Sequence, residues 1–359
     1  MEEALGIGSF GASLRVENVQ ALAARLDHSK AIPERYVRPE REEEKLKVAV
    51  AGAGDSIPVI DFARLLDPLF AREESARLHS ACQDWGFFQL INHGIDEDVI
   101  KKMVGALEEF FKLPLEEKEK VGQVEGQIEG YGQAFVQSED QKLDWGDMLF
   151  IGTSPPQRKN LRFWPINPPS FRDSTEKYAE EVKKVADFLA GVMSENLGLG
   201  RELYDLFKNG IQSFRFNYYP PCPSADKVLG LSPHSDGVGF TLLLQVNGRP
   251  GLQIRRDGRW LAVEPLQGAL VINIGDIVEI LCNGRYKSIE HRAVISSEWE
   301  RMSVAAFHLL DVGQVVGPIP QIARREKVLY KSLLFEEYAK MFFKSKLKGK
   351  SKLDQMKLE

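Results

Sequence analysis

The sequence predicts a mainly β protein with flanking helices, in which a helical N-terminal part precedes a core of short strands and a helix closes the chain. From about 211 to 310, short apolar runs such as IQSFRFNYY, TLLLQV and ALVINIGD are separated by Pro, Gly and Asp-Gly turns. Runs of this length and spacing are typical of a sandwich, barrel or jelly roll. The segment 334–347 (LFEEYAKMFFKSKL) has helical periodicity and predicts the closing helix.

The N-terminal part is predicted to combine helices with two strands. Residues 16–26 favour a short amphipathic helix, and residues 34–56 change from charged to small side chains, which is typical of a mobile linker. Strands are expected at 57–62 (IPVIDF) and 87–92 (FFQLIN), and helices at 73–84 and 95–111.

A longer helix is expected from about 174 to 197. Asp173 or Ser174 can cap its first turn, and Gly198 lies just past its end. The apolar residues of this segment fall on one helical face: Tyr178, Val182, Val185, Leu189, Val192 and Met193. This spacing predicts an amphipathic helix.

Composition and charge argue against several classes of protein. With a formal charge of −5 and a pI near 5.9, the chain has no electrostatic reason to bind nucleic acid. It shows no secretory signal, and no apolar run approaches the ~20 residues of a membrane helix. Cys82, Cys222 and Cys282 have neither metal-like nor disulfide spacing, which suits a reducing compartment. We expect a soluble, cytoplasmic monomer, with the basic stretch 344–352 as a solvated tail.

The first candidate site is a metal site formed by His234, Asp236 and His291. Residues at i and i+2 of an extended segment point to the same side, so His234 and Asp236 can converge on one ion. His291 follows a strand–turn–strand stretch, as a return strand of the same barrel requires. Two imidazoles and one carboxylate bind Fe(II) in oxygenases and leave positions open for O2 and a second substrate. A His-x-Asp pair alone is common by chance, so the prediction needs all three residues.

The remaining histidines are interpreted as structural or surface residues, and His308 is the nearest rival for the third ligand. Strand alternation argues against His308, because it lies on the face opposite to Arg301. The residues that share the face of Arg301 are Ser303, Ala305, Phe307 and Leu309.

A second candidate site would bind a dicarboxylate such as 2-oxoglutarate. The distal carboxylate of such a ligand needs a bidentate, permanently charged partner, for which Arg is suited and Lys is not. Arg301 and Ser303 alternate onto one strand face and together form a carboxylate clamp. In the strand 211–219, Asn217 and Tyr219 share a polar face, opposite an aromatic face. That polar face fits a cavity inside a barrel, although a surface strand would show the same pattern.

The ordered motifs IPVIDF, WGFFQLINHG, NYYPPCP, HSD, His291 and RMS resemble the plant-type 2-oxoglutarate/Fe(II)-dependent dioxygenase family over about 57–345. Further segments, such as GYGQAFVQSEDQKLDWGDMLF and LQIRRDGRWLAVEPL, resemble its senescence-related-gene and alkaloid O-demethylase branch. The resemblance implies a double-stranded β-helix (jelly roll) core and a C-terminal lid helix. It also implies iron at the three metal residues, and 2-oxoglutarate at Arg301, Ser303, Tyr219 and Asn217. Ascorbate is the expected reductant.

On this basis the chain divides into four regions. These are a variable N-terminal segment and linker (1–56), a helical N-terminal dioxygenase region (57–200), a jelly-roll catalytic core (201–320), and a C-terminal helix and tail (321–359).

The expected substrate is a small aromatic plant metabolite or hormone-like compound that is hydroxylated or O-demethylated. Phe307 shares the face of Arg301, and with Phe135, Phe240 and Leu309 it would form an apolar slot for a flat ring. Arg215 would meet a phenolate, carboxylate or other acceptor. The alternative is that Phe307 and Phe240 are ordinary core residues. Two alternative functions also stay open: a 2-oxoglutarate-independent relative similar to ACC oxidase, and a non-catalytic jelly roll that binds a small molecule.

Overall fold

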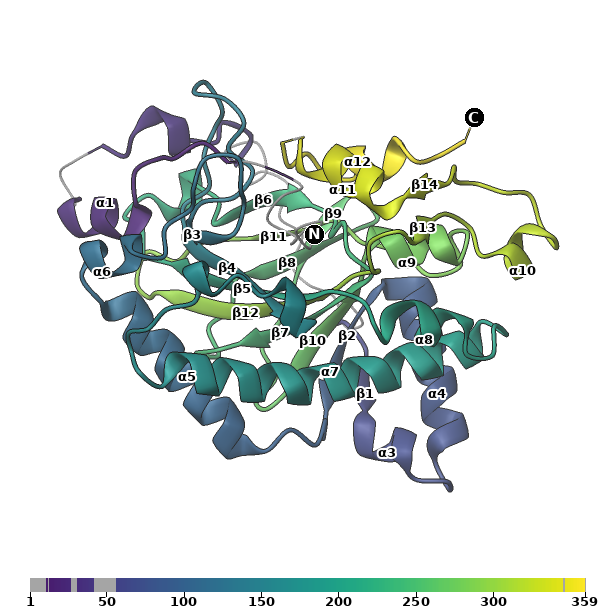
Figure 1. The fold of residues 1–359 in the computed structure, drawn as a ribbon. Coiled ribbons are helices and arrows are strands. Elements are labelled where there is room, and N and C mark those ends of the chain that lie inside the picture. The colour runs from purple at the N-terminus through teal and green to yellow at the C-terminus, as the bar shows by residue number, and fades with distance from the viewer. Residues whose placement is uncertain (1–10, 12, 27–30, 42–55, 345, 359) are drawn as a thin grey trace.

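Two β-sheets form the centre of the structure, a computed structural model that describes residues 11, 13–26, 31–41, 56–344 and 346–358 (Figure 1). The larger sheet has the strand order β1, β2, β10, β7, β12, β5, β4, β3. In that order the strands span Val59–Asp61, Phe87–Ile91, Leu270–Ile274, Phe240–Gln245, Arg301–His308, Gln212–Tyr219, Asp147–Ser154 and Gly130–Gly132. The second sheet consists of β6 (Leu231–His234), β11 (His291–Ala293), β8 (Leu252–Arg256) and β9 (Arg259–Ala262).

The two sheets face each other across a cavity that residues of both sheets line. A further short pair, β13 (Val315–Val316) and β14 (Leu333–Leu334), lies outside both sheets. Two facing sheets of mainly antiparallel strands are the architecture of a jelly roll. The predicted mainly β fold with a jelly-roll core is therefore confirmed.

The larger sheet crosses the sequence boundary expected at residue 200. Its strands β1, β2, β3 and β4 come from the region 57–200, and the other four come from the region 201–320. β4 pairs with β5 and β2 pairs with β10, both in antiparallel register. The N-terminal region therefore contributes half of the larger sheet, in addition to its helices.

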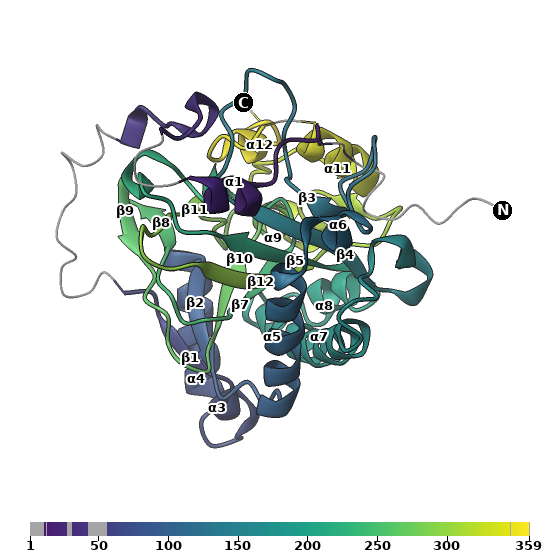
Figure 2. The same cartoon turned by 90° about the vertical axis from the view of Figure 1, so that its left-hand side faces the viewer.

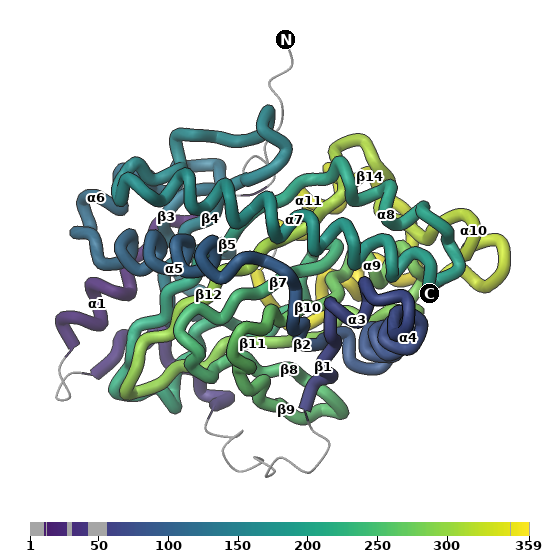
Figure 3. The backbone as a smooth tube through the Cα atoms, turned by 90° about the horizontal axis from the view of Figure 1, so that it is seen from below, coloured from purple at the N-terminus to yellow at the C-terminus, as the bar shows by residue number. Residues whose placement is uncertain are grey.

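Two long helices, α5 (Glu97–Lys112) and α7 (Phe171–Asn196), lie side by side across the outer face of the larger sheet (Figure 3). The aromatic face predicted for β5 meets α7, since Phe216 contacts Phe171 at a ring distance of 5.5 Å and Phe214 contacts Tyr178 at 5.8 Å. This packing leaves the polar face of β5 for the space between the sheets.

The start of α7 differs from the prediction. The helix begins at Phe171, its N-cap is Ser170, and no side chain there makes a capping hydrogen bond. The expected caps Asp173 and Ser174 lie inside the first turn. Phe171 is fully buried against Phe110 and Phe216, so apolar packing at the first residue sets this end of the helix.

The remaining predicted helices and strands are present with small shifts. The helix expected at 73–84 appears as α4 (Ala71–Ser80) and a π-helical turn, Ala81–Trp85. Gly86 ends that turn with φ 61°, and a Cβ there would lie 2.0 Å from the carbonyl oxygen of Lys287. Only glycine fits such a position. The other helices are α1 (Val19–Arg25), α3 (Phe62–Leu66), α6 (Leu115–Glu119), α8 (Glu202–Phe207), α9 (Asp276–Leu281), α10 (Pro320–Ala323), α11 (Phe335–Phe343) and α12 (Ser351–Asp354).

Helix α1 confirms the short helix expected at 16–26 and is hydrogen-bonded to the larger sheet. Its first amides, those of Val19 and Gln20, donate to the two carboxylate oxygens of Asp147 on β4 at 2.9 and 2.8 Å. Most of the expected linker at 34–56 lies outside the described residues, as does His28.

The basic stretch 344–352 is not a solvated tail, and that prediction is wrong for its last residues. The amide of Gly349 donates to the carbonyl oxygen of Pro233 at 2.9 Å, and Lys352 is only 4% exposed. Apolar packing holds this segment against the rest of the protein, because Leu353 and Met356 are fully buried in the main hydrophobic core. Two perpendicular views place α11 and α12 together at one end of the sheets (Figures 1 and 2).

Within the described part of the chain, no helix combines the length and the apolar character needed to cross a membrane.

Candidate active site

Three buried side chains converge at one end of the smaller sheet. His234 is the last residue of β6, Asp236 follows two residues later, and His291 is the first residue of β11. His234 and His291 are direct partners in the antiparallel register, and their rings lie 4.2 Å apart. One ligand atom from each of the three residues lies within 4.8 Å of the others. The structure therefore brings the predicted triad together.

Both imidazoles are turned so that Nε2 faces the carboxylate. The Nδ1 atom of His234 lies 2.8 Å from the carbonyl oxygen of Ser232, and that of His291 lies 3.1 Å from the carbonyl oxygen of Ile289. A proton shared with a carbonyl leaves the lone pair on Nε2, which is the arrangement of a metal ligand. The two Nε2 atoms lie 3.4 and 3.6 Å from Oδ1 of Asp236.

The other carboxylate oxygen of Asp236 is held by two neighbouring strands. Oδ2 accepts from Oγ1 of Thr241 at 2.7 Å and from Nδ2 of Asn273 at 2.8 Å. Thr241 on β7 and Asn273 on β10 are cross-strand partners. The sequence analysis missed both residues, because their role depends on a strand pairing that local pattern does not reveal.

Burial and neighbouring charge prepare these groups for a cation. Burial, helped by the proximity of His234, lowers the pKa of His291 to about 4, so its imidazole is neutral and free to donate a lone pair. Burial alone would raise the pKa of Asp236, but the two imidazoles and Thr241 outweigh it and hold that pKa well below its usual range. Two imidazoles and a carboxylate fit Fe(II).

A second group of polar residues lies on β12 and β5, two neighbouring strands of the larger sheet. Arg301 pairs with Tyr219, and Ser303 pairs with Asn217, so all four side chains point to the same face. Nδ2 of Asn217 donates to Oγ of Ser303 at 3.3 Å, and the guanidinium of Arg301 lies 5.5 Å from the ring centre of Tyr219. The four residues predicted for 2-oxoglutarate thus line one cavity with the triad.

This cavity, which we call the inner cavity, contains unsatisfied polar groups. Arg301 is 4% exposed, and its Nη2 donates to the amide oxygen of Gln245 at 3.2 Å. Among the described residues, Nε of Arg301 and Oδ1 of Asn217 have no hydrogen-bond partner. A buried guanidinium without a carboxylate is costly, so the inner cavity fits an anionic ligand.

A second, mainly apolar cavity adjoins the first, and we call it the outer cavity. It shares His234, Asp236, Arg215 and Phe307 with the inner cavity. Other walls are Phe135, Met148, Phe150, Gly237, Phe342 and Phe343. Three of the residues predicted for the substrate, Phe307, Arg215 and Phe135, thus line one cavity beside the triad.

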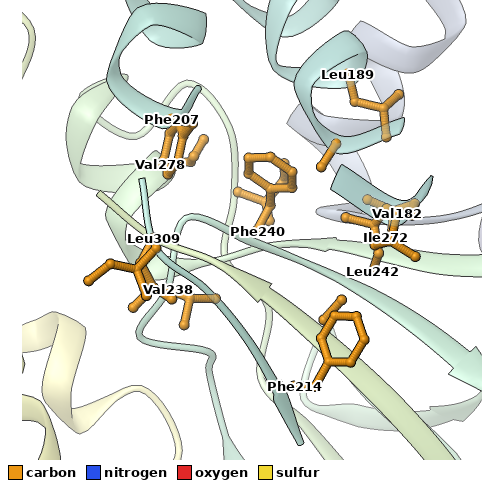
Figure 4. Packing of buried hydrophobic residues seen from close by; sticks show 14 of the residues in the cluster. Val182, Leu189, Phe207, Phe214, Val238, Phe240, Leu242, Ile272, Val278 and Leu309 are labelled. Carbon is orange, nitrogen blue, oxygen red and sulfur yellow. The ribbon is translucent and has the colours of Figure 1, made fainter. Parts of the chain in front are cut away.

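Phe240 and Leu309 do not belong to this group, and their predicted place in an apolar slot is wrong. Both lie in the main core, where Phe240 contacts Phe207 at a ring distance of 5.3 Å and is stacked on His308 (Figure 4). The register explains the error for Phe240: it pairs with His308, whereas Thr241 pairs with Phe307, so Phe240 lies on the opposite face. Strand β12 ends at His308, so the alternation does not extend to Leu309.

Replacing Phe240 by alanine should therefore reduce stability without a selective effect on the site. Phe240 is 1% exposed, and the loss of a fully buried phenylalanine costs about 3–5 kcal/mol. Chemical denaturation should show a lower free energy of unfolding by roughly this amount. The ratio of product formed to co-substrate consumed should stay at the wild-type value, and a fall in that ratio would return Phe240 to the site.

Family models match two parts of the chain. Residues 57–171 match the N-terminal region of non-haem dioxygenases in morphine synthesis, and residues 210–309 match the 2OG-Fe(II) oxygenase superfamily. The second match contains the triad and also Arg301, Ser303, Tyr219 and Asn217, which we call the Arg301 group.

Individual proteins match over nearly the whole chain. S-norcoclaurine synthase 1 of Coptis japonica is 51% identical over 348 residues, which cover 97% of this chain and 98% of the relative. Oxoglutarate-dependent flavonoid 7-O-demethylase 1 of Ocimum basilicum is 44% identical over 354 residues, which cover 98% and 93%. The crystal structure of JOX2 in complex with 2OG, Fe and JA has a TM-score of 0.85 at 33% identity, and covers 96% of this chain and 99% of that chain.

Proposed function

The chain belongs to the 2OG-Fe(II) oxygenase superfamily and is a 2-oxoglutarate-dependent dioxygenase, and on that premise we propose that it hydroxylates or O-demethylates a small aromatic metabolite or hormone-like compound. The resemblance drawn from the sequence motifs, including the O-demethylase branch, is confirmed. The observation that supports the substrate class is the pair of adjoining cavities: one polar around Arg301, the other aromatic, with the triad between them.

His234, Asp236 and His291 would hold the iron. When bound, Fe(II) and 2-oxoglutarate activate O2 to oxidise a substrate C–H bond, and CO2 and succinate are released. The chain contributes orientation: carbonyl contacts fix both imidazoles, and Thr241 and Asn273 fix the carboxylate. Such outer contacts keep the three ligand atoms in one geometry before the ion arrives.

Arg301, Ser303, Tyr219 and Asn217 would bind the co-substrate. The guanidinium lies buried and lacks a carboxylate partner among the described residues, so a ligand carboxylate would supply the missing charge. Tyr219, on the neighbouring strand, faces the guanidinium, and Asn217 would lie nearer the keto-acid end of the ligand. The co-substrate would thereby be oriented toward the triad, which lines the same cavity.

The outer cavity would hold the substrate between aromatic walls. Phe307 and Phe150 lie with ring centres 6.3 Å apart, and flat rings pack well against such walls. Arg215 would meet an acceptor group of the substrate, since it borders the outer cavity. Of the two relatives named above, one is by name a flavonoid 7-O-demethylase and the other a synthase of S-norcoclaurine, and the flavonoid agrees with an aromatic ligand. Oxidation of an O-methyl group would give a hemiacetal, which collapses to an alcohol or phenol and formaldehyde.

The proposal is tested by comparing plant metabolite extracts before and after incubation with the enzyme, Fe(II), ascorbate and 2-oxoglutarate. We expect an aromatic compound to be consumed, with equimolar succinate, and formaldehyde as well where the reaction is an O-demethylation. Omission of any one of iron, 2-oxoglutarate or O2 should stop product formation. Consumption of exclusively non-aromatic compounds would overturn the substrate class.

Replacing Phe307 by alanine should separate substrate oxidation from co-substrate consumption. Because Phe307 borders both cavities, its loss misplaces the substrate while the Arg301 group stays intact. Product formation should fall at least about tenfold, whereas succinate formed without substrate should stay within about twofold. Phe240→Ala is the matched control, with the same change in the core. Equal loss of both activities in Phe307→Ala, with a lower melting temperature, would assign Phe307 to the core.

We further infer that ascorbate keeps the iron reduced and that the protein acts as a cytoplasmic monomer in plant secondary metabolism. Its three buried, free thiols support a reducing compartment. Size-exclusion chromatography with light scattering would test the monomer, whose mass is 40.5 kDa.

A further inference from the structure

Lys352 on α12 is a buried amine that contacts aromatic rings in place of hydrogen-bond acceptors. Its side chain is 4% exposed, and Nζ has no hydrogen-bond partner among the described residues. Nζ lies 3.7 Å from the ring centre of Phe342 and 4.3 Å from that of Phe135. A cation over a ring face is attracted by the negative charge of that face. Both rings line the outer cavity, so one ammonium holds two of its walls together.

The backbone around Lys352 is anchored on both sides. Before it, the amide of Gly349 donates to the carbonyl oxygen of Pro233, next to the iron ligand His234, and Nζ of Lys350 pairs with Glu279 at 3.2 Å. After it, Leu353 is fully buried in the main core. The position of Nζ is therefore set by the fold and does not depend on a free chain end.

The ring of Phe342 contacts both the amine of Lys352 and the backbone of Gly237, the residue after Asp236. A Cβ at Gly237 would lie 2.1 Å from the Phe342 ring, so the ring lies directly on the glycine backbone. Phe135 meets Phe342 edge to face at 5.9 Å and is stacked on Phe343 at 5.8 Å. A shift of the Phe342 ring would therefore change the cavity wall beside the triad.

Fold stability gives no reason for an amine at this position. Burial lowers the pKa of Lys352 to about 7, against the opposing charge of Asp276, so the folded protein holds this ammonium at a cost. A methionine has a similar length and would fill the same space without that cost. Residues that lower stability in this way are often kept for function.

We propose that Lys352 is a positioning residue for the substrate: its ammonium fixes the rings of Phe135 and Phe342 and so sets which flat ring the outer cavity accepts. The inference rests on the proposed function, since it takes the outer cavity to be the substrate site. It adds the C-terminal segment to the determinants of specificity, although Lys352 itself does not line the cavity.

Three variants separate charge from packing. Lys352→Met keeps the length of the side chain and removes the charge, whereas Lys352→Arg keeps the charge in a larger side chain. Lys357→Met is the matched control, because it makes the same change on the same segment at a residue that is 48% exposed and paired with Asp354. Melting temperatures establish that each variant is folded.

The first measurement uses 7-methoxyflavone as a flat, O-methylated probe, with formaldehyde and succinate as products. In Lys352→Met, the KM for the probe should rise about tenfold and formaldehyde per succinate should fall, while the KM for 2-oxoglutarate stays within about twofold. Lys352→Arg keeps a cation beside both rings, so every parameter should change less in it than in Lys352→Met, and Lys357→Met should match wild type. Wild-type values in Lys352→Met, or an equal loss in Lys352→Met and Lys352→Arg, would overturn the proposal.

The second measurement needs no substrate. Hydrogen exchange of the peptide Phe335–Phe343 should be faster in Lys352→Met than in wild type and should be restored in Lys352→Arg. Should wild type leave 7-methoxyflavone unchanged, the proposed substrate class loses support, and hydrogen exchange decides the role of Lys352 by itself. Equal exchange in Lys352→Met and wild type would then overturn the positioning role.

Discussion

Replacing His291 by alanine should abolish iron-dependent turnover while the protein stays folded. His291 supplies one of three ligand atoms that lie within 4.8 Å of each other, and two remaining ligands cannot hold Fe(II) firmly. Even residues that only orient a ligand contribute roughly 10- to 100-fold to metal affinity. Removal of the ligand His291 itself should therefore lower the affinity for Fe(II) at least about 100-fold. Anaerobic titration with Fe(II) and metal analysis of the purified protein measure the loss of iron binding, and succinate formation measures the loss of turnover.

His79→Ala is the control for this change. His79 is a partly buried histidine on α4 whose Nδ1 lies 2.8 Å from the hydroxyl of Tyr286, away from the triad. It should bind iron and turn over like wild type. Normal iron content and activity in His291→Ala would refute the ligand assignment, and His308 would have to be considered again despite its place against Phe240.

The features that the sequence analysis predicted correctly depend on short-range geometry. The i, i+2 spacing of His234 and Asp236 and the alternation along β12 and β5 each follow from the two-residue period of an extended chain. The cross-strand pairs of Arg301 with Tyr219 and Ser303 with Asn217 then put these four side chains into one cavity. Alternation also excluded His308, which the structure buries on the opposite face.

The errors arise where the arrangement depends on pairing between distant strands or on burial by other segments. The prediction for Phe240 is wrong because the sheet face on which its side chain lies depends on the register of β7 with β12, which the local sequence does not reveal. Thr241 and Asn273 were missed for the same reason. The C-terminal lysines looked like a solvated tail because charge dominates their composition, yet Leu353 and Met356 draw that segment into the core.

Replacing Arg301 by alanine should weaken 2-oxoglutarate binding by orders of magnitude and leave iron binding nearly unchanged. Arg301 is buried, and Nε of its guanidinium has no hydrogen-bond partner among the described residues, so the distal carboxylate of the co-substrate is its expected partner. Loss of one partner from a buried, hydrogen-bonded charge pair costs about 2–5 kcal/mol, which corresponds to a roughly 30-fold to several-thousand-fold higher KM. Succinate formation at varied 2-oxoglutarate, and calorimetry with the metal-loaded protein, would measure the change.

Two further variants make this result specific. Arg301→Lys keeps the positive charge but loses the bidentate fork, so its KM should lie between those of wild type and Arg301→Ala. Arg255→Ala removes an arginine that is 46% exposed and paired with Glu290 on the smaller sheet, and it should behave like wild type. An unchanged KM for 2-oxoglutarate in Arg301→Ala would refute the clamp, because a buried guanidinium that binds the co-substrate cannot be removed without loss of affinity.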